Sequence, residues 1–568
     1  MEQYTGADAF IEVLNAHGVE NIFFNPGGEQ AAIQATIARN RVLGKRSPRL
    51  VLCLDESVAL TAAHGNYVVT GQPQIVMVHS ELGTLQLGGA LHNAQWGRVP
   101  VVLWAGLAPA AQRTDWMNQP YDQGLIARNS VKWDHNIGPN EDIQETLQEA
   151  LRAASTEPRG PVYLTYGRDS LTKKIDRKPI APFMPAPPSE SIDGETLDKV
   201  ADTLIQAKNP MVLVGYTARY PETIPMLVDL AETLAAPVLT SQVYLNFPNN
   251  HPLSAGIEQI LGSRKGNPYL GEADVILVID YDMPYAAAAG APGPNARIIH
   301  VDVDPLTVGR PLFMRGAGTF IKADSRLAIP QITKALKQRL TPPKRQELTK
   351  RFAELSAAHR RDREQWRASA EAQRHSRPIS PDWLCRCLAE VIDEDTIVVN
   401  HTISHSASVT EQLERSKPGT LIGCPAGSIQ FGLGASLGAK IGAPSATVVS
   451  VMTDGGFVWG CPVATLWSAK AYRAPFLAVI CNNQSYGFIR QLVRNTAGES
   501  ESGFTDRMAF EAGVDFVPPI DYAGIAESCG AFGRTLEDPA EVPAVMRTAM
   551  DEVRRGRAAV IDARLERG

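Results

Sequence analysis

Short apolar runs alternate with longer amphipathic or small-residue stretches along most of this chain. The runs that predict strands lie at 21–24, 50–53, 75–78, 99–104, 162–165, 211–214, 238–240, 275–279, 298–302, 446–452 and 476–480. The segments between them, such as 7–17, carry helical patterns. This alternation is typical of parallel sheets covered by helices. The sequence therefore predicts an α/β fold with three doubly wound parallel-sheet domains.

Two polar segments divide this pattern. The first, 178–188, is rich in proline and is interpreted as a linker. The second, 341–376, is highly charged and favours a surface helix that joins two domains, with Trp366 as its anchor. We expect an N-terminal domain over 1–178, a central domain with a structural role over 190–340, a helical linker over 341–378 and a C-terminal domain over 379–568.

Length and charge restrict the class of protein. A chain of 568 residues can bury several cores, and its formal net charge of −6 makes nucleic acid an unexpected partner. No apolar run reaches eighteen residues, and the first residues lack a basic region followed by an apolar one. We expect a cytoplasmic protein without a membrane partner.

Polar residues with metal-binding chemistry follow two of the predicted strands. Asp454 comes directly after the run 446–452 and is followed by two glycines, and Asn482 and Asn483 follow the run 476–480. Ligands of open α/β sheets bind at the carboxyl ends of strands, and glycines let backbone N–H groups approach a phosphate closely. Magnesium prefers oxygen ligands, which Asp454, Asn483 and a carbonyl near Ser485 could supply. An Asp-Gly-Gly segment alone would be an ordinary turn.

Together with Tyr486-Gly487, this spacing resembles the signature of thiamine diphosphate enzymes, Gly-Asp-Gly followed by Asn-Asn. The resemblance implies thiamine diphosphate and Mg²⁺ as cofactors, and the three-domain fold of that family. It assigns the metal to Asp454, Asn483 and Ser485. Thr453 stands where the family has glycine, and its backbone can serve if its φ is negative.

Glu56 follows another predicted strand and precedes a helix rich in small residues. By itself it would be a helix N-cap or first-turn glutamate. Thiamine diphosphate enzymes place their activating glutamate at this point. The resemblance implies that Glu56 is the catalytic acid that shares a proton with N1′ of the aminopyrimidine and so lets the 4′-amino group act as a base.

Further segments resemble the loops that surround this cofactor. The segment 424–432 resembles a turn in which the Gly427 carbonyl accepts from the 4′-amino group and Ile429 separates the two rings, although Ile429 could also be ordinary helix packing. The segment 398–406 resembles a loop that touches the diphosphate, where Ser404 could donate. The residues that the resemblance places against the cofactor are Asn25, Pro26, Gly27, Glu56, Ser404, Gly427, Ile429, Asp454, Gly455, Gly456, Asn483, Ser485 and Tyr486.

Two other residues connect the chain to particular branches of the family. His79 falls where benzoylformate decarboxylases hold a catalytic histidine and could relay protons, although a histidine after an apolar strand can also be a packing residue. Gln119 lies in a stretch that resembles acetolactate synthases and could donate to a substrate carbonyl. Gly28 occupies the position of a substrate-binding serine, and no histidine lies in 285–289.

The resemblance implies an enzyme that makes or breaks a carbon–carbon bond next to a carbonyl, a 2-oxo acid decarboxylase or carboligase. Its substrates would be small 2-oxo acids or aldehydes. The alternatives are an acyl-CoA lyase similar to oxalyl-CoA decarboxylase, and a non-catalytic homologue that only binds the cofactor. We do not expect FAD in the central domain. The family also implies a homodimer or homotetramer with active sites between subunits.

Overall fold

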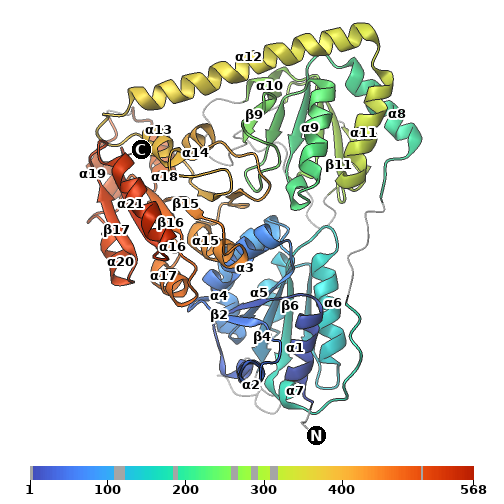
Figure 1. Cartoon of the computed structure of the whole chain (residues 1–568), viewed down its shortest axis with the longest axis vertical. Coiled ribbons are helices and arrows are strands. Elements are labelled where there is room, and N and C mark those ends of the chain that lie inside the picture. Colours follow the sequence, from blue (N-terminus) through green and yellow to red (C-terminus); the bar gives the residue numbers. More distant parts are fainter. Residues whose placement is uncertain are drawn as a thin grey trace.

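Three six-stranded parallel sheets, one in each domain, form the chain (Figure 1). The structure is a computed structural model that describes residues 4–107, 122–182, 190–257, 267–282, 292–306, 318–500 and 503–567. Helices cover the sheets, so the α/β class predicted from the alternation of apolar runs is confirmed. No helix in these ranges is both long and apolar enough to cross a bilayer.

The N-terminal sheet has the strand order β2-β1-β3-β4-β6-β5. Its strands are β1 (Asn21–Phe24), β2 (Arg49–Leu52), β3 (Gln74–Val78), β4 (Val101–Leu107), β5 (Trp133–Ile137) and β6 (Val162–Gly167). Its helices are α1 (Gly6–Ala16), α2 (Ala31–Val42), α3 (Glu56–Thr70), α4 (Ser80–Trp96), α5 (Gly124–Ala127), α6 (Ile143–Ser155) and α7 (Arg168–Thr172), with short 3₁₀ turns η1 (Gly28–Gln30) and η4 (Arg128–Ser130).

The C-terminal sheet repeats this strand order, as β14-β13-β15-β16-β18-β17. Its strands are β13 (Ile397–His401), β14 (Leu421–Gly423), β15 (Val448–Thr453), β16 (Leu477–Asn482), β17 (Phe532–Leu536) and β18 (Ala559–Arg564). Its helices are α13 (Pro381–Ala389), α14 (Ser406–Gln412), α15 (Phe431–Gly442), α16 (Asp454–Trp459), α17 (Pro462–Ala471), α18 (Gly487–Ala497), α19 (Asp506–Glu511), α20 (Tyr522–Ser528) and α21 (Val542–Arg554). The N-terminal and C-terminal sheets therefore have the same strand order, and the carboxyl ends of their strands are arranged in the same way.

The central sheet differs, with the order β12-β11-β10-β7-β8-β9. Its strands are β7 (Pro210–Val214), β8 (Val238–Thr240), β9 (Ser254–Ile257), β10 (Val275–Ile279), β11 (Arg297–Asp302) and β12 (Gly318–Lys322). Its helices are α8 (Gly194–Gln206), α9 (Thr223–Leu234), α10 (Pro268–Glu272) and α11 (Ser325–Arg339), after the short 3₁₀ turn η5 (Thr217–Arg219).

The charged segment forms one long helix, α12 (Pro342–Ala372), which runs from the central domain to the C-terminal domain (Figure 1). Trp366, the expected anchor, is only half-buried. Arg363, on the same helix, is buried, and its guanidinium lies 2.6 Å from a carboxylate oxygen of Glu414 in the C-terminal domain. An ion pair therefore helps to hold this end of the helix.

Helix α3 of the N-terminal domain packs against α15 of the C-terminal domain (Figure 1). Their backbones approach so closely that a Cβ on Gly438 would lie 1.7 Å from the carbonyl oxygen of Ala62. A Cβ on Gly65 would lie 2.0 Å from the carbonyl oxygen of Ala435. One continuous hydrophobic core runs through both domains as a result.

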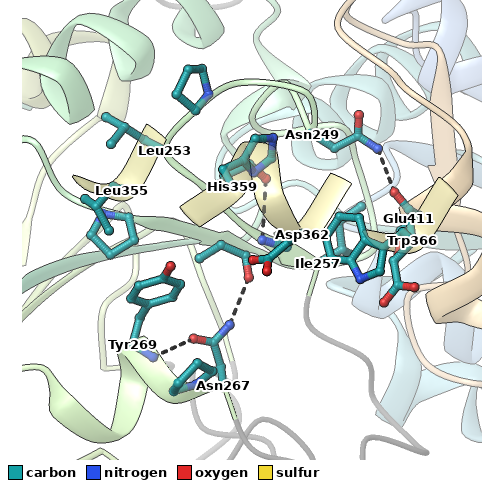
Figure 2. Close-up of a pocket in the computed structure, with 17 residues that line it drawn as sticks. Asn249, Leu253, Ile257, Asn267, Tyr269, Leu355, His359, Asp362, Trp366 and Glu411 are labelled. Atoms are coloured by element: carbon teal, nitrogen blue, oxygen red, sulfur yellow. Dashed lines mark hydrogen bonds between the residues drawn. The ribbon is translucent and has the colours of Figure 1, made fainter. Parts of the chain in front are cut away.

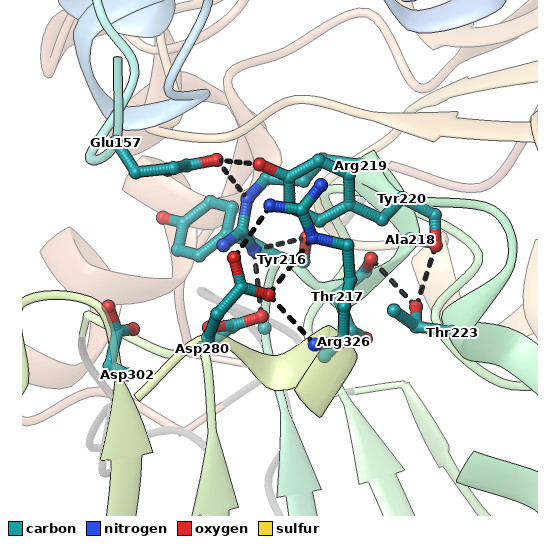
Figure 3. A network of polar contacts seen from close by, with 12 residues as sticks. Glu157, Tyr216, Thr217, Ala218, Arg219, Tyr220, Thr223, Asp280, Asp302 and Arg326 are labelled. Atoms are coloured by element: carbon teal, nitrogen blue, oxygen red, sulfur yellow. Dashed lines mark hydrogen bonds and ion pairs between the residues drawn. The ribbon is translucent and has the colours of Figure 1, made fainter. Parts of the chain in front are cut away.

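Buried ion pairs connect the N-terminal and central domains (Figure 3). Arg219 binds Glu157 at 2.9 Å and Asp280 at 2.8 Å, and Arg98 binds Asp282 at 2.5 Å and Asp302 at 3.1 Å. The three aspartates stand at the carboxyl ends of β10 and β11. Charged side chains thus fill part of the edge at which α/β sheets commonly bind ligands.

The arginines of this network determine the direction in which the pKa of Glu157 is shifted. Burial by itself would raise the pKa of Glu157, but the guanidinium groups of Arg219 and Arg159 outweigh it and hold that pKa well below its usual range. Removing one partner would leave an uncompensated buried charge, which costs roughly 3–5 kcal/mol. The network therefore fixes the two domains relative to each other.

Candidate active site

The predicted metal ligands lie at the carboxyl ends of two neighbouring strands. β15 and β16 pair in parallel with Thr453 opposite Cys481, so Asp454 and Asn483 leave the sheet side by side. Asp454 Oδ1 accepts a hydrogen bond of 2.8 Å from the N–H of Gly455. Its other oxygen, Oδ2, is buried and has no hydrogen-bond partner among the described residues, and the same holds for Ser485 Oγ. Two buried oxygen atoms are thus left to bind a ligand.

This donor set fits magnesium held together with phosphate. Burial raises the pKa of Asp454 to about 7, although the N–H groups of Gly455, Gln484 and Ser485 oppose the shift. A bound cation would offset the desolvation of that carboxylate. Within the described ranges no three His, Cys, Asp or Glu side chains cluster as a metal site. Other ligands would have to come from phosphate, carboxamide, carbonyl or water oxygens, which is the chemistry that Mg²⁺ prefers.

The side chains of the two asparagines of the motif have different hydrogen-bond partners. The side chain of Asn482 is turned into the sheet, where its Nδ2 donates to Asp562 Oδ1 at 2.6 Å. Asn483 Oδ1 accepts from the N–H of Ser485 at 3.2 Å. A Cβ on Gly487 would lie 2.5 Å from Asn483 Nδ2 and 3.8 Å from Ser404 Oγ, so Ser404 stands beside the predicted metal site. Ser404 is itself exposed.

The first glycine after Asp454, Gly455, lies against an aromatic side chain. A Cβ on Gly455 would be 2.8 Å from Tyr486 Cε1. The hydroxyl of Tyr486 accepts a 3.1 Å hydrogen bond from Trp459 Nε1, and its ring contacts Phe516 edge-on at 4.8 Å between centroids. Thr453 has φ −78°, so the negative value that the sequence required at this position is present.

The turn that contains Gly427 and Ile429 lies against the N-terminal domain. Gly427 has φ +74°, a conformation that favours glycine. Ile429 is half-buried in the turn before α15, so it is not part of that helix. Between them, the Ser428 carbonyl accepts from Asn93 Nδ2 of α4 at 3.1 Å. The turn is therefore anchored through α4.

Glu56 is buried at the first position of α3, beyond the carboxyl end of β2. The N-cap is Asp55, whose side chain accepts from the N–H groups of Ser57 and Val58. Glu56 is thus left free of the capping role that the sequence alone suggested. A Cβ on Gly83 of α4 would lie 2.6 Å from Glu56 Oε1, so the carboxyl group rests directly on that helix.

His79 lies at the carboxyl end of β3, immediately before α4. Its side chain is 41% exposed, which argues against a purely packing role. Its Nδ1 lies 2.9 Å and 3.1 Å from the two carboxylate oxygens of Glu29, a buried residue that the sequence reasoning missed. The only signal for Glu29 is its place directly after the Asn25-Pro26-Gly27-Gly28 segment.

The N-terminal residues share one edge of their sheet. Asn25, Pro26 and Gly27 follow β1, Glu56 follows β2 and His79 follows β3. Gln119 lies outside the described residues. These residues therefore gather at adjacent strand ends, as a ligand site in an α/β sheet requires.

A cavity of about 270 Å³ lies elsewhere, between β9, α12 and α14 (Figure 2). Its wall includes His359, Asp362, Trp366 and Glu411. None of the residues predicted to bind the cofactor lines it. It is therefore separate from the candidate active site.

Models of one protein family match all three domains. They are the N-terminal thiamine pyrophosphate (diphosphate) binding domain over 4–126, the central domain over 197–330 and the C-terminal thiamine pyrophosphate binding domain over 403–563. The chain is 26% identical to benzoylformate decarboxylase of Pseudomonas aeruginosa, over 92% of each protein. It is also 26% identical to acetolactate synthase isozyme 3 large subunit of Escherichia coli, over 100% of this chain and 96% of that one.

Solved structures show the same fold. A benzoylformate decarboxylase from Polynucleobacter necessarius superposes with a TM-score of 0.81 at 19% identity, covering 99% of both chains. A thiamine diphosphate-dependent 4-hydroxybenzoylformate decarboxylase from Rhodococcus jostii superposes with a TM-score of 0.78 at 22% identity, again over 99% of both. With all three domains matched along its length, this chain belongs to the thiamine pyrophosphate enzymes and is an enzyme of the decarboxylase or carboligase type.

Proposed function

We propose that this protein uses thiamine diphosphate and Mg²⁺ to cleave or form a carbon–carbon bond next to the carbonyl group of a small 2-oxo acid or aldehyde. The observation that carries this proposal is a pair of buried oxygens at adjacent strand ends, Asp454 Oδ2 and Ser485 Oγ, which have no hydrogen-bond partner among the described residues. The cofactor, when bound, supplies a carbon nucleophile and an electron sink.

The residues of this chain would bind and orient that cofactor. Asp454, Asn483 and Ser485 would hold the metal, and Ser404 and Tyr486 would lie beside the diphosphate. The Gly427 carbonyl would accept from the 4′-amino group, with Ile429 between the rings. These assignments are supported by the contacts around Gly455 and Gly487 and by the backbone of Gly427.

Glu56 and His79 would take part in proton transfer. Glu56 would hold a proton at N1′ of the pyrimidine, and its burial against Gly83 supports a low-dielectric setting. His79 would transfer a proton to or from the substrate-derived carbon or oxygen, a step for which its exposed imidazole is suited. Gln119 is proposed on resemblance alone to donate to the substrate carbonyl.

We also infer that the active enzyme is a homodimer or a homotetramer with sites between subunits. Large apolar side chains stand exposed near the site residues, Leu82 at 61% and Leu85 at 60% on α4, and Trp459 at 49% and Val463 at 61% around α16 and α17. Such grouped exposure is typical of association surfaces. A second copy of the chain is the partner that the family resemblance implies.

The central domain is proposed to bind no flavin. Arg98 and Arg219 pair with aspartates at the carboxyl ends of β10 and β11, the edge at which a dinucleotide would otherwise be expected. This supports a structural role for the domain.

A panel of 2-oxo acids and aldehydes, starting with benzoylformate and pyruvate, tests the function. Carbon dioxide release and ketol formation are measured with Mg²⁺ and thiamine diphosphate present, and again after both are removed. We expect turnover of at least one substrate that disappears without the cofactors. If thiamine diphosphate fails to bind in calorimetry, the proposal is wrong.

A further inference from the structure

A buried carboxylate holds the imidazole of His79 from one side. Glu29 Oε1 lies 2.9 Å from His79 Nδ1 and also accepts a 2.9 Å hydrogen bond from the N–H of Ser80. The N–H of Ser80 and a ring nitrogen of His79 therefore converge on one carboxylate at the beginning of α4, where the helix dipole also favours negative charge. In the described part of the chain, the hydrogen bonds of the His79 side chain involve Nδ1 only.

The backbone packs tightly around the side chains of Glu29 and His79. A Cβ on Gly106, at the end of β4, would lie 1.6 Å from Glu29 Cγ. A Cβ on Gly27 would lie 2.1 Å from His79 Nδ1 and 2.5 Å from both Glu29 oxygens. Glycines from two strand ends thus enclose the contact between the carboxylate and the ring.

The residue that follows His79 is held in an uncommon conformation. Ser80 has φ +40°, in the left-handed region that a non-glycine residue seldom adopts. Its N–H points to Glu29 Oε1, so the carboxylate stabilises this backbone at the same time as it binds the ring. Such strain persists where the surroundings determine it and is frequent at functional sites.

We propose that Glu29 is a positioning residue that fixes His79 with its proton on Nδ1 and so leaves Nε2 as the atom that transfers protons. This inference rests on the role proposed above for His79. A carboxylate that accepts from two donors binds the Nδ1–H form of a neutral imidazole, whereas a free imidazole prefers its proton on Nε2. Which nitrogen carries the proton is set by the hydrogen bond of the other one.

Two measurements test the proposal. The first is the tautomer of His79, read from ¹⁵N chemical shifts of histidine-labelled protein by solid-state NMR, with His79→Ala used to assign the signal. We expect Nδ1–H in the wild type and in Glu29→Gln, whose amide oxygen can still accept, and loss of this preference in Glu29→Ala. A wild type with its proton on Nε2 would overturn the proposal.

The second measurement is a double-mutant cycle on turnover. Glu29→Ala should lower turnover by roughly tenfold or more, up to the roughly 10²–10⁴-fold that complete loss of acid–base catalysis costs, and Glu29→Gln should restore most of it. In a His79→Ala background, Glu29→Ala should have no further effect. Full additivity of the two changes, or Glu29→Gln as impaired as Glu29→Ala, would show that Glu29 does not act through the ring.

A matched control is available on the surface. His135 Nε2 lies 2.6 Å from Glu141 Oε2, so Glu141→Ala removes a similar carboxylate–imidazole contact away from the site and should leave turnover unchanged. Thermal midpoints of all variants report loss of folding. The tautomer is measured without substrate, so it tests Glu29 even if no substrate is turned over, a result that would count against the proposed function alone.

Discussion

The hydroxyl of Thr453 accepts a 3.0 Å hydrogen bond from the backbone N–H of Gly456. Thr453 is the N-cap of α16, the short helix that begins with the predicted metal ligand Asp454. In the glycine-containing signature of the family this hydroxyl has no counterpart. In this chain the Thr453 hydroxyl is the acceptor for the N–H group of Gly456 at the carboxyl end of β15.

Thr453→Ala should therefore have two opposite effects. The free energy of unfolding of the cofactor-free protein should fall by about 1 kcal/mol, the usual cost of losing an N-cap. Thiamine diphosphate should bind more tightly, because the N–H of Gly456 becomes free to donate to phosphate. Thr505→Ala, at the N-cap of α19, is the control for the stability effect. Weaker cofactor binding in Thr453→Ala would mean that the hydroxyl itself serves the cofactor.

Asp454→Ala and Asn483→Ala should each abolish magnesium-dependent binding of thiamine diphosphate. The diphosphate would lose the cation that neutralises its charge, while the fold remains. Titration calorimetry with and without EDTA measures this. Unchanged affinity in both variants would remove these residues from the metal site.

Glu56→Gln should keep the cofactor bound but slow the exchange of its C2 hydrogen by orders of magnitude. An amide lacks the titratable proton that Glu56 would share with the pyrimidine. Hydrogen–deuterium exchange at C2, followed by NMR, measures this step without a substrate. Wild-type exchange in the variant would show that Glu56 is not the activating acid.

Gly438→Ala should destabilise the pair formed by α3 and α15. The added Cβ would lie 1.7 Å from the Ala62 carbonyl oxygen, so the helices must separate. We expect a loss of about 3 kcal/mol or more, at the upper end of the overpacking range. Gly194→Ala, whose Cβ would have nothing within 4 Å, should have almost no effect. Urea denaturation compares the two.

Glu411, in the cavity beside α12, should make stability depend on pH. Burial, together with Asp382 and Asp362, raises its pKa to about 7 against the opposing Arg363. Its protonated form therefore stabilises the fold at pH values below its unfolded pKa, and this contribution is lost as the pH rises through 7. Glu411→Gln stays neutral, so it should gain about 1–3 kcal/mol relative to wild type between pH 5 and pH 8. A difference that is independent of pH would contradict this.

Much of the fold could be predicted from the sequence because the central strands of its sheets are buried on both faces. Strands such as β10 and β16 are continuous apolar runs, and such runs are recognisable without any neighbour. Most edge strands were missed, although the edge strand β2 was predicted, and the inner strand β18 was missed as well. β5, with the sequence Trp-Asp-His-Asn-Ile, is mostly half-buried and polar, since only one of its sides pairs with another strand.

The site also has residues that the sequence predicted and contacts that only the tertiary structure shows. Asp454 and Asn483 were predicted because a polar residue directly after an apolar run is a local feature of the sequence, and Glu56 and His79 were predicted because their places after such runs resemble those of family residues. Only the tertiary structure decided that Asn482 binds Asp562. It alone placed Glu29 against His79, fifty positions along the chain, because strands β1 and β3 are neighbours in the sheet. Local runs determine strands and their ends, whereas contacts between distant residues depend on strand order and helix packing, which no local pattern encodes.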